Sequence, residues 1–432
     1  METPQAPDRH SHFFGGSYAR TTYAFNLILV ASTYPLWIGS EFPAIPLFRS
    51  LLPVPIQIDW LCGGALSVLL LTGLLVGKRA LPPIAVGIAT CSLILVALNQ
   101  HRLQPWFYQL ILTSIILGLA QVGYQQRLLQ FLSLSIYSYS ALGKFDYEFC
   151  HTVGPQFVSA VCEAISLEPS SWSTERLWQL SLLLPTLELL LAALLAWSLF
   201  SQKGTLCVFA GSAAVAFHLC LAFVFCFLLQ HSWGVIFWNL LFAIQAWLLF
   251  SNPTESLAYA PKANIGSWFT IVMLTLVMGL PCLERFGYWD HWLSWSLYSP
   301  HSSRVDISIG EPYIASLPTL LQESAKQQDI ESNEAAFEVW RSIPIAEWSL
   351  KATGAPIVPQ SRFQLGIAKA MTKRTSNPYS VQVALKGVAH RLTGQRETLS
   401  AVGTDEIEKL GSRFWFNTAP REPTQRISAT NQ

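Results

Sequence analysis

The sequence contains little charge. Only 12% of its 432 residues are Asp, Glu, Lys or Arg, about half of what soluble globular proteins carry, whereas 51% are hydrophobic. The charge is also unevenly placed: residues 1–284 hold 11 Lys and Arg and 12 Asp and Glu, against 16 and 14 in residues 285–432. A soluble protein of this length needs more polar surface. The composition therefore predicts an integral membrane protein with a polar C-terminal part.

Further absences exclude several classes of function. The net charge is +1 and there is no long basic or acidic run, so the electrostatic basis for binding nucleic acid is missing. None of the eight cysteines forms a Cys-x-x-Cys pair, which argues against a thioredoxin-like motif or a zinc ribbon. No His-x-x-x-His pair of the metalloprotease type occurs, and we predict no metal site. Residues 1–20 are polar and indicate no cleavable signal peptide.

Long apolar stretches recur through the first two-thirds of the chain. A helix needs about 20 mostly apolar residues to cross the ~30 Å hydrocarbon core of a bilayer. Pro-rich or charged turns separate the stretches, and tryptophans recur at their edges, as at a membrane interface. The sequence thus predicts an all-α bundle of about nine transmembrane helices within residues 21–284. The predicted helices are 21–38, 60–77, 82–98, 106–122, 128–144, 178–200, 205–229, 232–250 and 266–283.

The loops between these helices favour one orientation, because cytoplasmic loops are enriched in Lys and Arg. With the N-terminus inside, the inner segments hold seven such residues and the outer loops four. We therefore expect a cell inner membrane protein with a cytoplasmic N-terminus and a C-terminal domain outside. Cys150 and Cys162 share one predicted outer loop and could pair, but their spacing does not decide this. The inner residues are Arg9, Arg20, Lys78, Arg79, Arg127, Lys203 and Lys262, and the outer ones are Arg49, Arg102, Lys144 and Arg176.

Residues 285–432 are predicted to form a small α+β domain with a disordered end. Segments 304–309 and 380–385 alternate like strands, whereas 335–341 and 363–373 have the pattern of helices. The aromatic segment 288–300 is typical of a chain leaving a bilayer at the interface.

One predicted helix carries a polar stripe. Ser133, Tyr137, Ser140 and Lys144 are spaced by four, three and four residues, which places them on one helical face. Such a stripe should face the bundle or a cavity. Lys144 could extend to the interface as a simple anchor. Alternatively it is withdrawn from water, and a desolvated lysine gives up its proton more readily and can act as a general base.

Other polar residues lie at positions where lipid is expected, and ionisable groups there cost on the order of 2.5–3.5 kcal/mol each. Glu188 and His218 are central in their helices, and either could be structural or take part in chemistry. Asn239 is typical of a residue that joins helices. His101 precedes the fourth helix in Asn99-Gln100-His101-Arg102, where an interfacial anchor is the plain alternative.

Residues 127–250 resemble the HTTM membrane domain, the family that includes the vitamin K-dependent γ-glutamyl carboxylase. The resemblance is carried by the segment 140–146 (Ser-Ala-Leu-Gly-Lys-Phe-Asp), a helix with the central acid Glu188, the pair Phe217-His218 and a closing helix from Ser232 to Asn239. The Asn-Gln-His element at 99–101 adds to it. Distantly similar patterns occur in DoxX/MauE redox-associated membrane proteins.

The resemblance implies roles for individual residues. Lys144 would be the base that deprotonates a reduced quinone, and His101 and His218 would lie near it. If the chain is an enzyme, Glu188 or His218 would orient this base or relay protons. Tyr137, Ser140 and Asn239 would contact the cofactor. Because only residues 285–432 follow the bundle, we do not expect the carboxylation of a protein substrate.

Two hypotheses follow from different classes of protein. In the first, the chain is a membrane enzyme, redox or carboxylase-like, that uses a quinone or another lipid-soluble cofactor and has an intramembrane lysine base. In the second, it is a non-catalytic scaffold or accessory subunit whose C-terminal domain docks a protein partner.

Overall fold

The computed structural model describes residues 9–253, 262–327 and 339–421, with side chains from Gly16 onward. The predicted disordered end lies outside the described residues from residue 422 on. So do the first residues of the polar N-terminal segment and most of the predicted helix 335–341.

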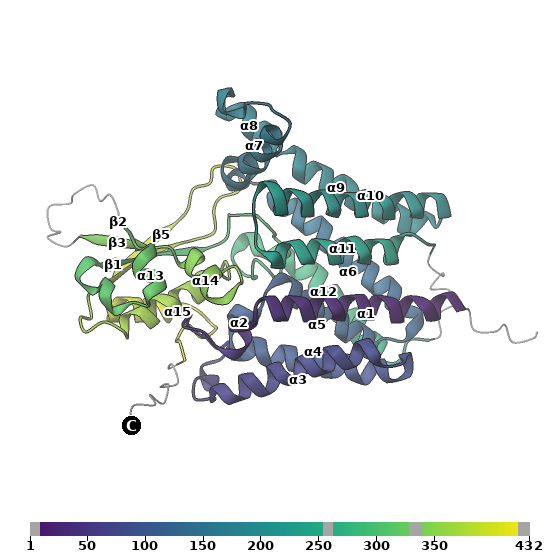
Figure 1. Ribbon diagram of the computed structural model, residues 1–432, viewed down its shortest axis with the longest axis horizontal. Helices are drawn as coiled ribbons and strands as arrows, with labels where there is room; N and C mark the ends of the chain where they lie inside the picture. The colour runs from purple at the N-terminus through teal and green to yellow at the C-terminus, as the bar shows by residue number, and fades with distance from the viewer. Residues whose placement is uncertain (1–8, 254–261, 328–338, 422–432) are drawn as a thin grey trace, which may run out of the picture.

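In the described residues, the bundle contains nine long helices that alternate in direction (Figure 1). Gln100 and Tyr147, in connections at one end of the bundle, hydrogen-bond to Asn417 and Arg391 of the C-terminal region. At the opposite end, the amide of Gln121 donates to Ser267 Oγ at the start of the last helix. The helices are α1 (Arg9–Ser32), α3 (Ile56–Leu75), α4 (Leu81–Leu98), α5 (Pro105–Leu119), α6 (Val122–Lys144), α9 (Leu183–Ser201), α10 (Gly204–Phe223), α11 (Trp233–Phe250) and α12 (Ile265–Gly279).

Six helical stretches in the described part are long and apolar enough to cross a membrane, judged by length and composition. The predicted nine crossings are therefore not confirmed, since α1, α5 and α6 do not meet the same criteria. Large apolar side chains on the six stretches point outward, including those of Leu75, Phe200 and Phe209. The six are Ile56–Leu75, Lys78–Leu98, Thr174–Ser201, Gly204–Leu228, Trp233–Phe250 and Ile265–Phe286.

Most side chains of α5 and α6, like those of α11, are buried in the bundle, but α5 and α6 do not meet the criteria for crossing a membrane. α5 has 15 residues, about 22 Å of helix, which is short for a bilayer. α6 carries Ser, Tyr and Gln side chains along its length. A central helix can hold polar side chains because its neighbours satisfy them, whereas a lipid-facing helix cannot. The polar side chains of α6 thus explain its low hydropathy, and they also make this helix the candidate for function.

The C-terminal region forms a five-stranded antiparallel sheet with the order β2-β3-β1-β4-β5. The predicted strands at 304–309 and 380–385 are confirmed as β1 and β4, and the predicted helix at 363–373 is confirmed as α15 (Ser361–Thr372), which packs against both. The end of the predicted helix 335–341 is instead strand β3. The strands are β1 (Arg304–Gly310), β2 (Lys326–Gln327), β3 (Trp340–Ile343), β4 (Val381–Lys386) and β5 (Thr398–Val402).

The sheet lies against one end of the bundle and shares its core with it (Figure 1). Phe42 and Ile45, from the connection between α2 (Tyr34–Ile38) and α3, pack in the same apolar cluster as the buried residues of β1 and α15. Buried charges reinforce this joint. Asp59 at the start of α3 accepts hydrogen bonds from Arg102, and from Arg421 at 2.7 Å, with all three side chains buried.

Asp59→Asn tests this joint. The substitution leaves two buried guanidinium groups without their counter-charge, which typically costs about 3–5 kcal/mol. We expect a clear fall in the midpoint of thermal unfolding of the protein in detergent. Lys351→Ala, which breaks an exposed pair with Glu347, is the matched control and should change it little. Equal midpoints for the two variants would contradict the role given to Asp59.

Candidate active site

Lys144 is the last residue of α6, and its side chain turns back into the bundle. Its Nζ donates to Ser140 O at 3.0 Å, to Ser140 Oγ at 2.6 Å and to Glu188 Oε2, on α9, at 2.7 Å. Lys144 is 5% exposed and Glu188 7%. The three donors of the ammonium group are therefore all used inside the protein. The lysine does not extend to the surface as a simple anchor would.

The polar stripe of α6 faces inward along its whole length. Ser133, Tyr137 and Ser140 are buried together with Lys144, as the spacing of four, three and four predicts for one face. One turn before Ser140, Tyr137 OH lies 2.6 Å from Nε2 of His218 on α10.

The neighbours of His218 determine which of its ring nitrogens carries the proton. The amide nitrogen of Asn239 donates to Val235 O at 2.9 Å, so its oxygen faces His218 Nδ1 at 3.1 Å. An amide oxygen only accepts, so Nδ1 carries the proton and donates. Nε2 of the neutral ring then accepts the hydrogen bond from Tyr137. The two residues form an acid and base pair beside the ion pair of Lys144 and Glu188.

Six of the seven predicted site residues line one pocket. It lies between α6, α9, α10 and α11 and encloses about 590 Å³ of space free of protein atoms, part of it open, around a free cavity of about 60 Å³. The cavity has room for a few water molecules, so a ring-shaped ligand requires aromatic side chains to move aside. The predicted residues in the lining are Tyr137, Ser140, Lys144, Glu188, His218 and Asn239. The other lining residues are Ile136, Phe157, Leu184, Phe217, Leu221, Phe225, Trp238, Phe242, Leu297 and Tyr298.

His101, the seventh predicted residue, is not part of this pocket. It lies in η3 (Gln100–Arg102), where the bundle meets the sheet, and its Nε2 is 3.0 Å from Ser349 Oγ and 3.2 Å from Pro356 O. Its ring packs against Phe42 and Phe363. The expectation that it lies near Lys144 does not match this position. The reason is its place in the loop before α5, which is covered by α14 (Ile345–Thr353), α15 and the connection between them.

Two features of the site were missed by the sequence interpretation. Leu297 and Tyr298 close the pocket from the segment 288–300, whose aromatic pattern is the same as that of an interfacial anchor. Glu284, His291 and His301 form a buried cluster, although we predicted no metal site. They are spaced by seven and ten residues outside a regular α-helix, and this spacing matches no known metal-binding motif. The two cysteines of the predicted outer loop, Cys150 and Cys162, are free thiols.

Comparisons with family models, with curated proteins and with solved structures found no match to this chain. Over the residues that the structure describes, the fold and site define a mostly helical protein with six membrane-length apolar helices, a small antiparallel sheet and a buried cluster of acid and base groups.

The position of His101 predicts a pH dependence of stability. Burial, together with the nearby charge of Arg102, lowers the pKa of His101 to about 4, although the Pro356 carbonyl opposes this. The unfolded chain, with a histidine pKa near 6.5, then binds more protons than the folded chain between about pH 4 and 6.5. The contribution of His101 is thus fully present above pH 6.5 and is lost as the pH falls through this window.

His101→Gln removes this titration. We expect the unfolding midpoint of the wild type to fall more steeply between pH 6.5 and 4 than that of the variant, with a difference of roughly 3 kcal/mol in the free energy of unfolding at the acid end. Parallel pH profiles of the two proteins would disprove this.

Proposed function

We propose that this protein is a multi-pass membrane enzyme that acts on a lipid-soluble quinone or quinol. The observation that carries the proposal is the position of two proton-transfer pairs, Lys144 with Glu188 and Tyr137 with His218, in the lining of one pocket. Apart from Ser140 and Asn239, its other lining residues are apolar or aromatic. Aromatic walls suit a flat ring, and the polar pairs suit its oxygens.

The Lys144 and Glu188 pair provides a base that is protected from water. With the lysine as ammonium and the glutamate as carboxylate, the pair can take up one proton from a quinol hydroxyl. The proton goes to Glu188, and the ammonium of Lys144 stabilises the quinolate that remains. The separation of 2.7 Å also permits the lysine proton to pass to Glu188, which turns Lys144 itself into the base. His218 and Tyr137 can hold the second oxygen of the ring.

The proposal includes the finer topology: nine membrane crossings in a cell inner membrane, with the N-terminus in the cytoplasm and the sheet outside. Its support is the alternation of the nine helices and the distribution of charge. The bundle end away from the sheet holds Lys78, Arg79, Arg127, Lys203 and Lys262, in agreement with the enrichment of basic residues inside.

A second candidate function is a non-catalytic scaffold that docks a protein partner through the sheet. It is favoured by the completeness of the hydrogen bonds around Lys144, since a fully satisfied interhelical joint needs no ligand.

Binding of quinol and quinone separates the two functions. We expect the wild type in detergent to bind reduced and oxidised decylubiquinone with quenching of tryptophan fluorescence, because Trp238 lines the pocket. The double variant Lys144→Met with Glu188→Leu removes both charges together, so it leaves no buried charge unpaired. We expect it to bind the quinol at least about tenfold more weakly.

Leu187→Ala is the matched control, because Leu187 precedes Glu188 on α9 but is 58% exposed on the outer face. It should bind like the wild type, and the unfolding midpoints of all three proteins check that they are folded. Wild-type protein that binds neither form, or a double variant that binds both like the wild type, would overturn the proposal and favour the scaffold.

A further inference from the structure

Two histidines and a glutamate meet where the last bundle helix passes into the sheet region. Glu284 lies in η8 (Leu280–Phe286), directly after α12, and His291 and His301 belong to the segment that leads to β1. His291 Nδ1 is 2.8 Å and His301 Nε2 is 2.7 Å from the same oxygen, Glu284 Oε1. All three side chains are buried, and their ligand atoms lie within 4.8 Å of one another.

The hydrogen bonds of His301 determine which of its ring nitrogens carries the proton. Ser299 Oγ lies 2.6 Å from the carbonyl oxygen of Gly143, which only accepts, so the Ser299 hydroxyl donates there. The Ser299 oxygen must then accept from His301 Nδ1, which places the ring proton on Nδ1. In a neutral imidazole, Nε2 therefore directs a lone pair at the carboxylate oxygen of Glu284.

A lone pair and a carboxylate oxygen 2.7 Å apart repel each other unless positive charge lies between them. That charge is either one more proton or a metal ion. Arg285 does not supply the charge, because its Nε is 4.0 Å from the other oxygen of Glu284 and its NH1 pairs with Asp146 at 2.6 Å.

We propose that Glu284, His291 and His301 bind one zinc ion. Two imidazole nitrogens and one carboxylate oxygen form a typical three-residue zinc set, whereas magnesium and calcium prefer oxygen ligands only. Ligand atoms about 2.0–2.1 Å from a tetrahedral ion lie roughly 3.3 Å apart, within the range of separations found here. In the described part of the chain, these residues are the one group of three that could hold a metal ion.

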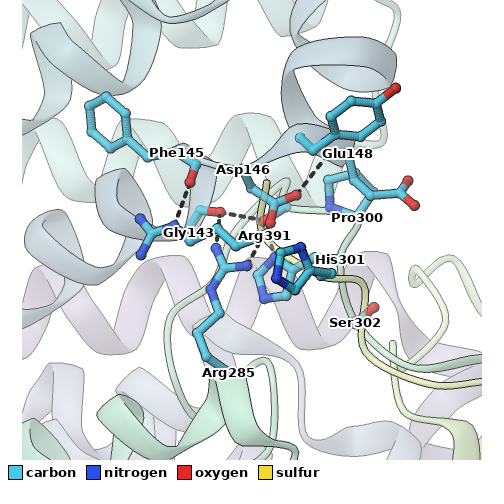
Figure 2. Close-up of polar contacts among 12 residues, drawn as sticks. Gly143, Phe145, Asp146, Glu148, Arg285, Pro300, His301, Ser302 and Arg391 are labelled. Carbon is cyan, nitrogen blue, oxygen red and sulfur yellow. Dashed lines mark hydrogen bonds and ion pairs between the residues drawn. The ribbon is translucent and has the colours of Figure 1, made fainter. Parts of the chain in front are cut away.

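The surroundings match those of a bound metal. A histidine ligand usually donates its second ring proton to an oxygen that fixes the ring, and Ser299 with Gly143 does this for His301. Figure 2 shows His301 close to Arg285, Asp146 and Gly143, at the C-terminal end of α6. The ion would therefore fasten the segment 287–303 to η8, directly after α12. None of its three ligands lines the pocket, so the ion would lie outside it.

Metal content is the direct test. Protein purified with a tag that contains no histidine is incubated with zinc sulfate, desalted and analysed by plasma mass spectrometry. We expect about one zinc per chain in the wild type and background levels in Glu284→Gln and His301→Gln. His390→Gln, at an exposed histidine, is the control and should keep the metal. Ser299→Ala retains the three ligands and should bind zinc roughly 10–100-fold more weakly.

A second measurement needs no variant. Cobalt added to the wild type should give the visible absorption bands of a four-coordinate site, and one equivalent of zinc should abolish them, whereas magnesium should not. A wild type that retains neither metal would overturn the proposal, as would a folded His301→Gln that keeps its zinc. These measurements do not involve a quinone, so their outcome is independent of the proposed function.

Discussion

The need to satisfy buried polar groups without water governs this structure. α6 brings a lysine, tyrosines, serines and glutamines into an apolar bundle, and each must find a partner inside the protein. Lys144 has its partner in Glu188 on α9, and Tyr137 in His218 on α10. The helices around α6 are therefore held in register by specific polar contacts, whereas apolar packing alone would permit them to slide or rotate. The pocket forms where these contacts converge.

The same constraint operates at the joint with the sheet. Asp59, Arg102 and Arg421 come from three distant parts of the chain and are buried together. Arg362 and Asp290 pair nearby in the same way. Buried pairs of this kind are costly to separate, so the sheet and the bundle act as one body. The segment 287–303 belongs to both, because Tyr298 closes the pocket while His301 lies beside the end of α6.

Much of the architecture was accessible from the sequence because long apolar runs and alternating strands have clear periods. Each predicted helix between 21 and 283 has a helix at its position, and strands β1 and β4 are where the alternation indicated. The nine predicted crossings are not confirmed, because α5 is shorter and α1 and α6 are less apolar than the six membrane-length helices of the described residues. The strand β3 was predicted as a helix end, since four residues are too few to show a period.

The candidate site, too, was predicted from the sequence only in part. The stripe of Ser133, Tyr137, Ser140 and Lys144 follows from helical geometry alone, and its burial is what that geometry predicts. Residue spacing within one helix does not show which helices are neighbours. The resemblance or the structure was therefore needed to place Glu188 and His218 beside this stripe. His101 was assigned to the wrong neighbourhood for the same reason, because α14 and the connection after it, which cover it, are more than 200 residues away in sequence.

The buried pairing of Asp59 has a consequence for how the protein is made. Arg421 lies 362 residues after its partner, so α3 enters the membrane with a carboxylate whose second counter-charge has not yet been synthesised. Arg102, only 43 residues later, reaches Asp59 first and can hold it through most of translation. The bundle can thus assemble early, but the start of α3 reaches its final state only after residue 421 has left the ribosome and folded back against it.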